Sequence, residues 1–274
     1  MSSVIPSRSP LSPAVVRAAV LAGSALFTNA EVVDRTGSTN ADLIAAARAG
    51  AASGSVLVAE EQTAGRGRLD RSWHSQPGAA LTFSVLLRPV TVPASRRGWL
   101  PLLTGVAVVA AIEAKTGVRA SLKWPNDVLV GGGEAPGKLA GILAEQAGDA
   151  IVVGVGLNVS ASRDELPSGQ ATSLWLAGAG SPDRQAILVA VLREIERWYL
   201  RWTSGPEPGN ATASGLRDAY LASCSTIGRD VRVELPGGGV LAGQATGVDA
   251  AGCLVVSASD GLHAVSAGDV VHVR

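Results

Sequence analysis

Cysteine and histidine are scarce in this chain, and neither sign of charge is in excess. The two cysteines, Cys224 and Cys253, form no CxxC pair, and the three histidines form no metal-binding spacing such as HxxxH. This pattern argues against a zinc site built by the protein and is typical of reduced, structural thiols in a cytoplasmic protein. Lysine plus arginine and aspartate plus glutamate number 23 each, which argues against a general polyanion binder but allows a local basic site.

Long apolar runs are also missing. The longest, residues 99–112, contains Pro101, Thr104 and Gly105 and falls short of the ~20 residues that a membrane-spanning helix needs. Residues 18–27 follow two arginines as in a signal peptide, but they are rich in alanine and glycine and only weakly apolar. The sequence therefore predicts no membrane segment and a cytoplasmic location.

Composition favours a folded protein of two unequal domains. Of the 274 residues, 47% are hydrophobic and 17% charged, which allows a sizeable core. From residue 227 onward the pattern changes to short apolar strands separated by Gly and Asp turns, typical of a small β-barrel. We expect a tail and short helix over residues 1–28, a large domain over 29–223 and a small β domain over 224–274.

The large domain reads as a mixture of strands and helices. Strands are expected at 31–34, 56–59, 81–87, 121–130 (interrupted by Pro125), 138–145 and 151–159, and helices at 13–22, from Ser38, Thr39 or Asn40 to 49, at 98–117, 183–202 and 211–223. This mixture predicts an α+β fold. Trp198 and Trp202 fall on the apolar face of a helix and are expected in the core.

One loop stands out between two expected strands. Residues 65–73, which we call the arginine loop, hold two glycines and three arginines. Glycine allows the backbone to approach a ligand closely, and the planar guanidinium fits carboxylate and phosphate oxygens. The loop therefore predicts an anion-binding segment, although a solvated surface loop or a nucleic-acid contact would have the same composition.

Two other features also indicate a ligand. The helix that begins at residues 38–40 offers free N–H groups and its positive dipole end to a polar ligand, although simple capping by these side chains accounts for them equally well. Gly154 and Gly156 lie inside an expected strand. Glycine weakens a strand, so its presence there predicts a bulge or the close approach of a ligand.

Taken in order, the motifs of the chain closely resemble those of biotin protein ligases, the biotin–acetyl-CoA-carboxylase ligases. The motifs are Thr36-Gly37-Ser38-Thr39-Asn40, Gly65-Arg66-Gly67-Arg68 with Trp73, Lys123-Trp124-Pro125-Asn126-Asp127, Lys138-Leu139-Ala140-Gly141-Ile142-Leu143 and Gly154-Val155-Gly156-Leu157-Asn158. Each motif alone is weak, but their shared order over about residues 30–160 is specific. The resemblance implies a class II synthetase-like fold, a mixed sheet flanked by helices, followed by an SH3-like barrel.

The resemblance also implies a two-step reaction. The biotin carboxylate attacks the α-phosphate of ATP, which gives biotinyl-5′-AMP and pyrophosphate, and a lysine of a biotin carboxyl-carrier domain then takes the biotinyl group. Cations have to offset the repulsion between two anionic reactants, and Mg²⁺ is expected to arrive with the nucleotide, without a dedicated protein metal site.

Residue roles follow from the same resemblance. Biotin binding is implied for Ser38, Thr39, Asn40, Gln62, Gly65, Arg66, Gly67, Arg68, Lys138, Gly141 and Gly156. ATP binding is implied for Arg68, Arg71, Trp73, Lys123, Asn126 and Asn158. Catalysis is implied for Arg66, Arg68, Lys138 and Asp127.

Some of these residues also have a plainer interpretation. Asp127 either orients the acceptor lysine, whose free pKa of about 10.4 requires help with deprotonation at neutral pH, or merely caps a turn. Trp124 and Pro125 are expected to be structural. Lys138 opens an apolar strand after a glycine-rich turn, which favours a role in the site over a solvated surface position.

Two departures from the family pattern concern loops. Leu69-Asp70 stands where a basic residue and a glycine are common, so the loop carries less positive charge. The glycine-rich hairpin tip at 131–137 is long, which surface tips tolerate. About 30 residues precede the first expected strand, too few for the DNA-binding module of the repressor-type members, so no DNA binding is expected. Either a monomer or a homodimer is compatible with the sequence.

Two rival functions remain to be tested. A lipoate or octanoate transferase of the same fold would carry a glycine-rich run leading into a His-Asp pair, whereas here Gly131-Gly132-Gly133 leads to Glu134. A non-enzymatic regulator that binds biotin or nucleic acid is disfavoured by the zero net charge and the absence of a DNA-reading module.

Overall fold

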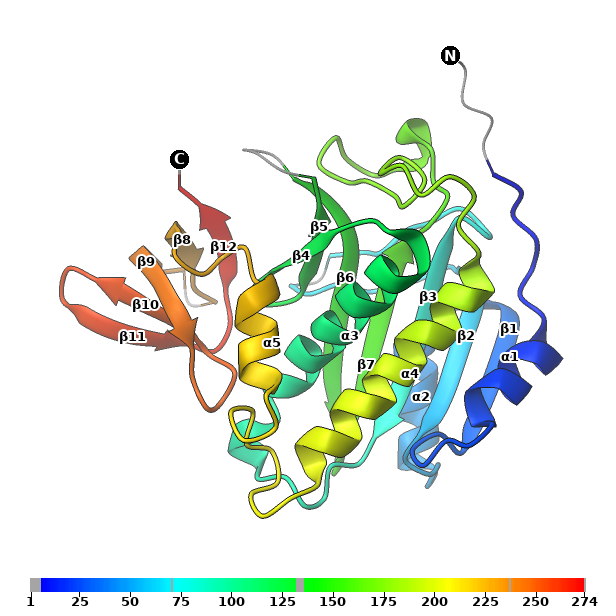
Figure 1. Ribbon diagram of the computed structural model, residues 1–274, viewed down its shortest axis with the longest axis horizontal. Coiled ribbons are helices and arrows are strands. Elements are labelled where there is room, and N and C mark those ends of the chain that lie inside the picture. The colour runs from blue at the N-terminus through cyan, green and yellow to red at the C-terminus, as the bar shows by residue number, and fades with distance from the viewer. Residues whose placement is uncertain (1–5, 70, 132–135, 237, 274) are drawn as a thin grey trace.

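The computed structural model describes residues 6–69, 71–131, 136–236 and 238–273, in which a seven-stranded sheet and a five-stranded sheet lie side by side (Figure 1). The larger sheet has the order β1-β2-β3-β7-β6-β5-β4 and is mixed, because β1 and β2 are parallel and the other neighbours antiparallel. Helices flank this sheet, so the predicted α+β fold is confirmed.

The first half of the large sheet forms close to the predicted places. Its elements are α1 (Pro13–Leu21), β1 (Asn29–Thr36), α2 (Thr39–Arg48), β2 (Ser55–Gln62) and β3 (Ala80–Leu87). Ser38 caps α2, since its hydroxyl accepts from the Ala41 N–H at 3.4 Å. This settles which of the three polar residues 38–40 begins the helix and leaves Thr39 and Asn40 inside its first turn.

α3 (Trp99–Thr116) is the central helix and carries almost no polar face. It packs against α4 (Arg184–Thr203), and together they cover one face of the sheet (Figure 1). By length and composition alone, Ala94–Thr116 at 23 residues would suffice to cross a membrane, which corrects the shorter run expected from the sequence. However, 67% of its most apolar window is buried, as in the core helix of a folded domain.

The segment predicted as one strand over 121–130 is a hairpin. β4 (Ala120–Lys123) and β5 (Asp127–Val130) pair antiparallel, with Lys123 opposite Asp127. Trp124, Pro125 and Asn126 form the turn between them. The prediction was wrong because Pro125 lies in a chain reversal and not within a continuous strand. The tip that follows β5 falls partly at residues 132–135, outside the described residues.

β6 (Gly137–Ala147) and β7 (Ala150–Asn158) form the middle of the sheet. α2 packs on the face opposite to α3 and α4, where Leu43, Leu57 and Val152 belong to a separate apolar cluster. α5 begins at Leu216 and ends at Ser223, later than predicted, because residues 211–215 form turns. Trp198 and Trp202 are buried in the core as expected.

The C-terminal sheet is antiparallel throughout. It comprises β8 (Asp230–Glu234), β9 (Val240–Val248), β10 (Leu254–Ala258), β11 (Gly261–Val265) and β12 (Asp269–His272), in the order β11-β10-β9-β8-β12. Two indole groups join it to the large domain. Trp124 Nε1, in the turn after β4, donates to the Gly252 carbonyl, and Trp99 Nε1, at the start of α3, donates to the Asp249 carbonyl, both at 3.2 Å. The small domain is therefore attached directly to the turn that follows β4.

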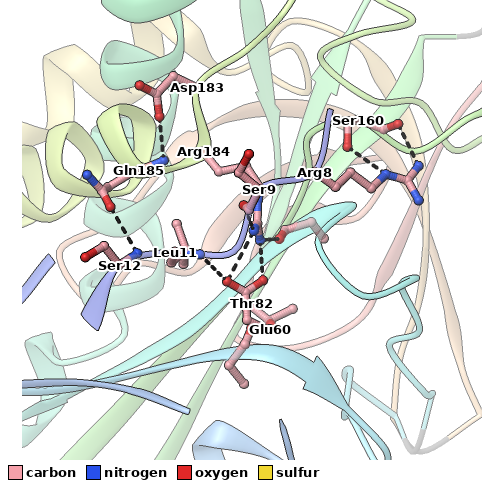
Figure 2. Close-up of polar contacts among 12 residues, drawn as sticks. Arg8, Ser9, Leu11, Ser12, Glu60, Thr82, Ser160, Asp183, Arg184 and Gln185 are labelled. Atoms are coloured by element: carbon pink, nitrogen blue, oxygen red, sulfur yellow. Dashed lines mark hydrogen bonds and ion pairs between the residues drawn. The ribbon is translucent and has the colours of Figure 1, made fainter. Parts of the chain in front are cut away.

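An N-terminal segment ahead of α1 is tied to the large domain by polar contacts (Figure 2). The buried Arg184 guanidinium donates to Glu60 Oε2 at 2.8 Å and to the Ser9 carbonyl at 2.8 Å. The Leu11 N–H donates to the other Glu60 oxygen at 2.6 Å. Because a buried charge is tolerated only when it is paired, this network fixes the segment against the end of β2.

Candidate active site

A cavity of about 260 Å³ opens beside the N-terminus of α2, on the face of the large sheet that α2 covers. Three groups of residues line it: the start of α2 and the strands beneath it, the arginine loop, and the turn after β4 with the adjoining end of β12. They are Ser38, Thr39, Asn40, Gln62, Arg66, Gly67, Arg68, Arg71, Ser72, Trp73, Phe83, Lys123, Trp124, Pro125, Asn126, Asp127, Lys138, Gly141, Ile142, Leu143, Gly154, Val155, Gly156, Asp269, Val270 and Val271.

At one end of the cavity lies a buried polar network. Thr39 donates its backbone N–H to Gln62 Oε1 at 2.8 Å, and its hydroxyl lies 2.7 Å from that of Ser84. Ser84 in turn donates to Asn40 Oδ1 at 2.6 Å. Gly154 is required here, because a Cβ at this position would lie 2.2 Å from Asn40 Oδ1. Close approach of Asn40 therefore explains one of the two glycines within β7.

Each arginine of the loop meets a different acceptor. Arg66 pairs with Glu145 of β6 at 3.2 Å, and Arg68 donates to Asn126 Oδ1 at 3.3 Å. Arg71 pairs with Asp269 of β12, so the small domain contributes directly to the wall of the cavity. Three separate segments of the fold thus hold the loop over the cavity.

Electrostatics within the cavity favour an anionic ligand. Burial lowers the pKa of the Arg68 guanidinium, while the carboxylates of Asp269 and Asp127 act in the opposite direction. A guanidinium remains charged at any physiological pH, so Arg68 is a half-buried cation facing the cavity. An anion bound there would recover part of the solvation that Arg68 has lost.

Opposite the loop, Lys138 lies near the start of β6 and its ammonium lies 2.7 Å from Asp127 Oδ1. Lys123 ends β4 across the hairpin from Asp127. The hairpin and the second residue of β6 therefore bring two ammonium groups and one carboxylate to the same cavity. The prediction that Lys138 belongs to the site and not to the solvated surface agrees with this placement.

The indole of Trp73 lines the cavity and packs against two glycines of the strands beneath it. Gly141 and Gly156 are cross-strand partners, and a Cβ on Gly156 would lie 2.3 Å from Trp73 Cε2. At Gly141 a Cβ would lie at an ordinary contact distance, 3.5 Å, from Trp73 Cζ3, so the indole requires glycine at position 156 only. Both glycines line the cavity, and their expected role of leaving room for biotin stays a prediction. Trp73 Nε1 is buried without a hydrogen-bond partner among the described residues, so it is available to a ligand oxygen.

Two predicted residues do not line the cavity. Gly65 lies at the base of the loop, where a Cβ would lie 2.4 Å from the Trp73 carbonyl oxygen, so it closes the loop and does not face the ligand space. Asn158 is buried and donates to the Thr172 carbonyl at 2.9 Å, which holds the end of β7. Asp70 lies outside the described residues.

Sequence reasoning missed several lining residues. Phe83, Ile142, Leu143 and Val155 belong to ordinary strand patterns and by themselves carry no sign of a ligand, whereas Gly154 was noted as a strand glycine but not assigned to the site. Asp269, Val270 and Val271 come from a domain whose packing against the large sheet no local pattern reveals. Strand periodicity places the side chains of Phe83 and Val155, which are cross-strand partners, on the core face of the sheet and does not predict that their strands border a cavity.

No cluster of three or more His, Cys, Asp or Glu side chains that could hold a metal ion occurs in the described part of the chain. The two carboxylates that line the cavity are both engaged by cations, Asp127 by Lys138 and Asp269 by Arg71. The donors that line the cavity are mainly nitrogen groups, which suit phosphate and carboxylate oxygens. A divalent cation would fit here only together with anionic ligands that supply oxygen atoms.

Comparison with known proteins decides the family. Residues 32–160 match the Biotin/lipoate A/B protein ligase family, and residues 226–273 match the Biotin protein ligase C terminal domain. A biotin–[acetyl-CoA-carboxylase] ligase from Mycobacterium tuberculosis is 44% identical over 97% of this chain and 97% of its own length. The chain belongs to the biotin protein ligase family.

Solved biotin protein ligases share the fold. The enzyme from Aquifex aeolicus in complex with biotin and ATP has a TM-score of 0.72 and 30% identity and covers 90% of this chain and 100% of its own. The bifunctional ligase/repressor BirA of Bacillus subtilis is 33% identical over 79% of this chain and 66% of its own length. The resemblance drawn from the motifs, including the SH3-like C-terminal domain, is therefore confirmed.

Within the biotin protein ligase family, the predicted site falls inside one matched region. Every site residue predicted from the sequence lies between residues 32 and 160. Asp269, which meets the arginine loop, lies instead in the matched C-terminal domain. In this biotin protein ligase, both matched regions thus contribute residues to a single cavity.

Proposed function

We propose that this protein activates biotin with ATP to biotinyl-5′-AMP and transfers the biotinyl group to a lysine of the biotin carboxyl-carrier protein of acetyl-CoA carboxylase. Family membership supports the reaction class, and the observation that carries the proposal is the convergence of cations from three segments on one cavity. Arg66 and Arg68 come from the loop, Lys123 from β4 and Lys138 from β6.

The first step requires two anions to meet. A carboxylate oxygen of biotin forms a bond to the α-phosphorus of ATP, and the bond from that phosphorus to the bridging oxygen breaks as pyrophosphate leaves. Negative charge accumulates on the α-phosphate in the transition state, so fixed cations stabilise it more than they stabilise the separated reactants. We assign this role to Arg68 and Lys138, with Arg66 orienting the carboxylate.

The polar network at the start of α2 suits the opposite end of biotin. The ureido group offers one carbonyl acceptor and two N–H donors. Among the residues lining this end, Gln62 carries amide N–H donors for the carbonyl, while Thr39 and Asn40, whose amide protons are used on Leu143 and Glu145, offer oxygen acceptors for the N–H groups. Ring and chain would then extend along the apolar wall formed by Trp73 and the strands toward the cations. This orientation places the carboxylate beside Lys138.

In the second step the amine of the acceptor lysine attacks the carbonyl carbon of the mixed anhydride, and AMP leaves. The attacking amine first has to lose a proton, and Asp127 is the carboxylate on this wall that could accept it. Because Asp127 is paired with Lys138 at 2.7 Å, it acts in this way only after Lys138 has turned to the substrate phosphate.

Nucleotide binding belongs to the Lys123, Asn126 and Arg71 side of the cavity. Mg²⁺ would arrive on the phosphates of ATP, where it neutralises charge on the leaving pyrophosphate. A monomer and a homodimer are both compatible with this chemistry.

Exchange of labelled pyrophosphate into ATP tests the proposal. The purified protein with ATP and Mg²⁺ is expected to catalyse exchange when biotin is added and not without it. Lipoate and octanoate serve as matched carboxylates of similar chain length. Exchange supported by lipoate or octanoate but not by biotin would show that the protein activates one of those acids instead. No exchange with any of the three acids would favour a non-enzymatic binding protein.

A further inference from the structure

One carboxylate outside the cavity connects its two ends. Glu145 lies on β6, beyond the residues that line the cavity, and accepts hydrogen bonds from both directions. Asn40 Nδ2 donates to Glu145 Oε2 at 2.7 Å, and Arg66 lies 3.2 Å from both carboxylate oxygens. Asn40 belongs to the buried end of the cavity and Arg66 to the arginine loop.

The polar contacts form a continuous chain behind the cavity. Ser84 donates to Asn40 Oδ1 at 2.6 Å, and its oxygen lies 2.7 Å from the Thr39 hydroxyl. Gln62 Oε1 lies within hydrogen-bond distance of both the backbone N–H of Thr39, at 2.8 Å, and its hydroxyl, at 3.0 Å. The amide nitrogen of Asn40 donates hydrogen bonds to the Leu143 carbonyl at 3.1 Å and to Glu145. Glu145 is thus the point at which the buried network meets a loop arginine.

The ion pair between Glu145 and Arg66 differs from an ordinary surface ion pair because its carboxylate is attached to buried residues. Arg66 is about half exposed, and a partly exposed pair by itself contributes little. Asn40 and Ser84, however, are almost completely buried, with 4% and 0% of their surface exposed. Their fixed positions fix Glu145, and Glu145 then holds one terminal nitrogen of Arg66 while the remaining donors of the guanidinium stay available to the cavity.

We propose that Glu145 is a positioning residue for biotin recognition, which orients Arg66 toward the substrate carboxylate and links that contact to the ureido end of the site. This inference rests on the proposed function. Glu145 does not touch the substrate, so its effect passes through Arg66. It follows that Glu145 matters for ligands that carry a carboxylate and much less for ligands that lack one.

Binding of biotin and of biotinol, in which CH₂OH replaces the carboxylate, tests the proposal by calorimetry. The wild-type protein is expected to prefer biotin, and Glu145→Gln, which removes the charge and keeps the shape, to reduce this preference by about tenfold. Biotinol affinity should change by less than about threefold, since the ureido end remains in place. Glu113→Gln, which removes an exposed carboxylate 3.9 Å from Arg119, is the matched control and should change neither.

A double variant separates positioning from a purely structural role. In an Arg66→Ala background, Glu145→Gln should cause no further loss of preference, because the residue through which it acts is gone. Equal weakening of biotin and biotinol by Glu145→Gln, or an added loss in the Arg66→Ala background, would overturn the inference. Failure of the wild-type protein to bind biotin would instead overturn the proposed function, so the two failures are distinguishable.

Discussion

Substitution of Gly156 by alanine tests how the indole of Trp73 is placed. The new methyl carbon would lie 2.3 Å from Cε2 and 2.7 Å from both Cζ2 and Nε1 of Trp73. Carbon atoms in favourable contact are about 3.5–4.0 Å apart, so the ring has to move by about 1 Å or more. Gly156 does not have a positive φ, so the strand itself accepts alanine without backbone strain.

Trp73, the displaced residue, belongs to the arginine loop. The substitution should therefore reduce biotin affinity more than the free energy of unfolding. Overpacking a rigid core costs about 1–3 kcal/mol, whereas a loop can yield, so the free energy of unfolding should change by less than about 1 kcal/mol. Biotin would lose its contact with the indole. About 60 Å² of apolar contact at about 25 cal/mol/Å² corresponds to about 1.5 kcal/mol, or slightly more than tenfold in affinity.

Two measurements on the same protein check this prediction. Calorimetric titration gives biotin affinity, and urea denaturation gives the free energy of unfolding. Gly169→Ala is the matched control, because a Cβ there would have no neighbour within 4 Å, and both quantities should remain at their wild-type values. Wild-type biotin affinity in a folded Gly156→Ala protein would refute the reasoning and remove Trp73 from the wall of the biotin site.

Three further predictions concern the cations and one titrating group. Lys138→Met should lower biotin-dependent pyrophosphate exchange by about 10²–10³, as expected for loss of one donor to a developing charge, while Lys115→Met at the exposed end of α3 should leave the rate unchanged. Arg68→Ala should release biotinyl-5′-AMP at least about tenfold faster, measured as free intermediate in a filtrate, because one charge-assisted contact to the phosphate is lost; unchanged retention would remove the loop from this role. Burial and neighbouring cations lower the pKa of His272 from 6.5 to about 4, so between these pH values the unfolded chain gains a proton that the folded chain does not, and stability falls as the pH falls. His272→Gln should flatten this loss in urea denaturation at pH 4.5 and 7, and an unchanged pH dependence would contradict the assignment.

Local patterns determined most of the large domain in advance. A polar cap within residues 38–40 and the almost wholly apolar α3 follow from side-chain chemistry and periodicity alone, whereas the structure selects Ser38 as the cap of α2. The hairpin of β4 and β5 escaped prediction because a proline within apolar residues fits both an interrupted strand and a tight turn. The antiparallel pairing of β4 with β5, which the sequence pattern does not reveal, decides for the turn.

In the site, too, motifs predicted some residues, whereas others depend on packing between distant segments. Motifs placed Arg66, Arg68, Lys123 and Lys138 together, and the structure brings all four to one cavity. They could not reveal Asp269, because its contact with Arg71 depends on how the small domain packs against the turn after β4.

The glycines illustrate a further limit of sequence reasoning. Gly154 and Gly156 signalled a close approach, but the approaching groups are Asn40 and Trp73 of the protein itself. A strand glycine indicates that space is required above the sheet without indicating what occupies it. Gly65 was likewise assigned to the ligand because it belongs to a motif, whereas its neighbour is the Trp73 carbonyl at the base of the loop.

A crystal structure with a non-hydrolysable biotinyl-adenylate analogue would test most directly whether cations from separate segments serve one reaction centre. Our account places the ureido ring at Thr39 and Asn40, and the group that replaces the phosphate within hydrogen-bond distance of Arg68 and Lys138. Binding of the analogue with that group turned toward solvent, or outside the cavity altogether, would contradict it.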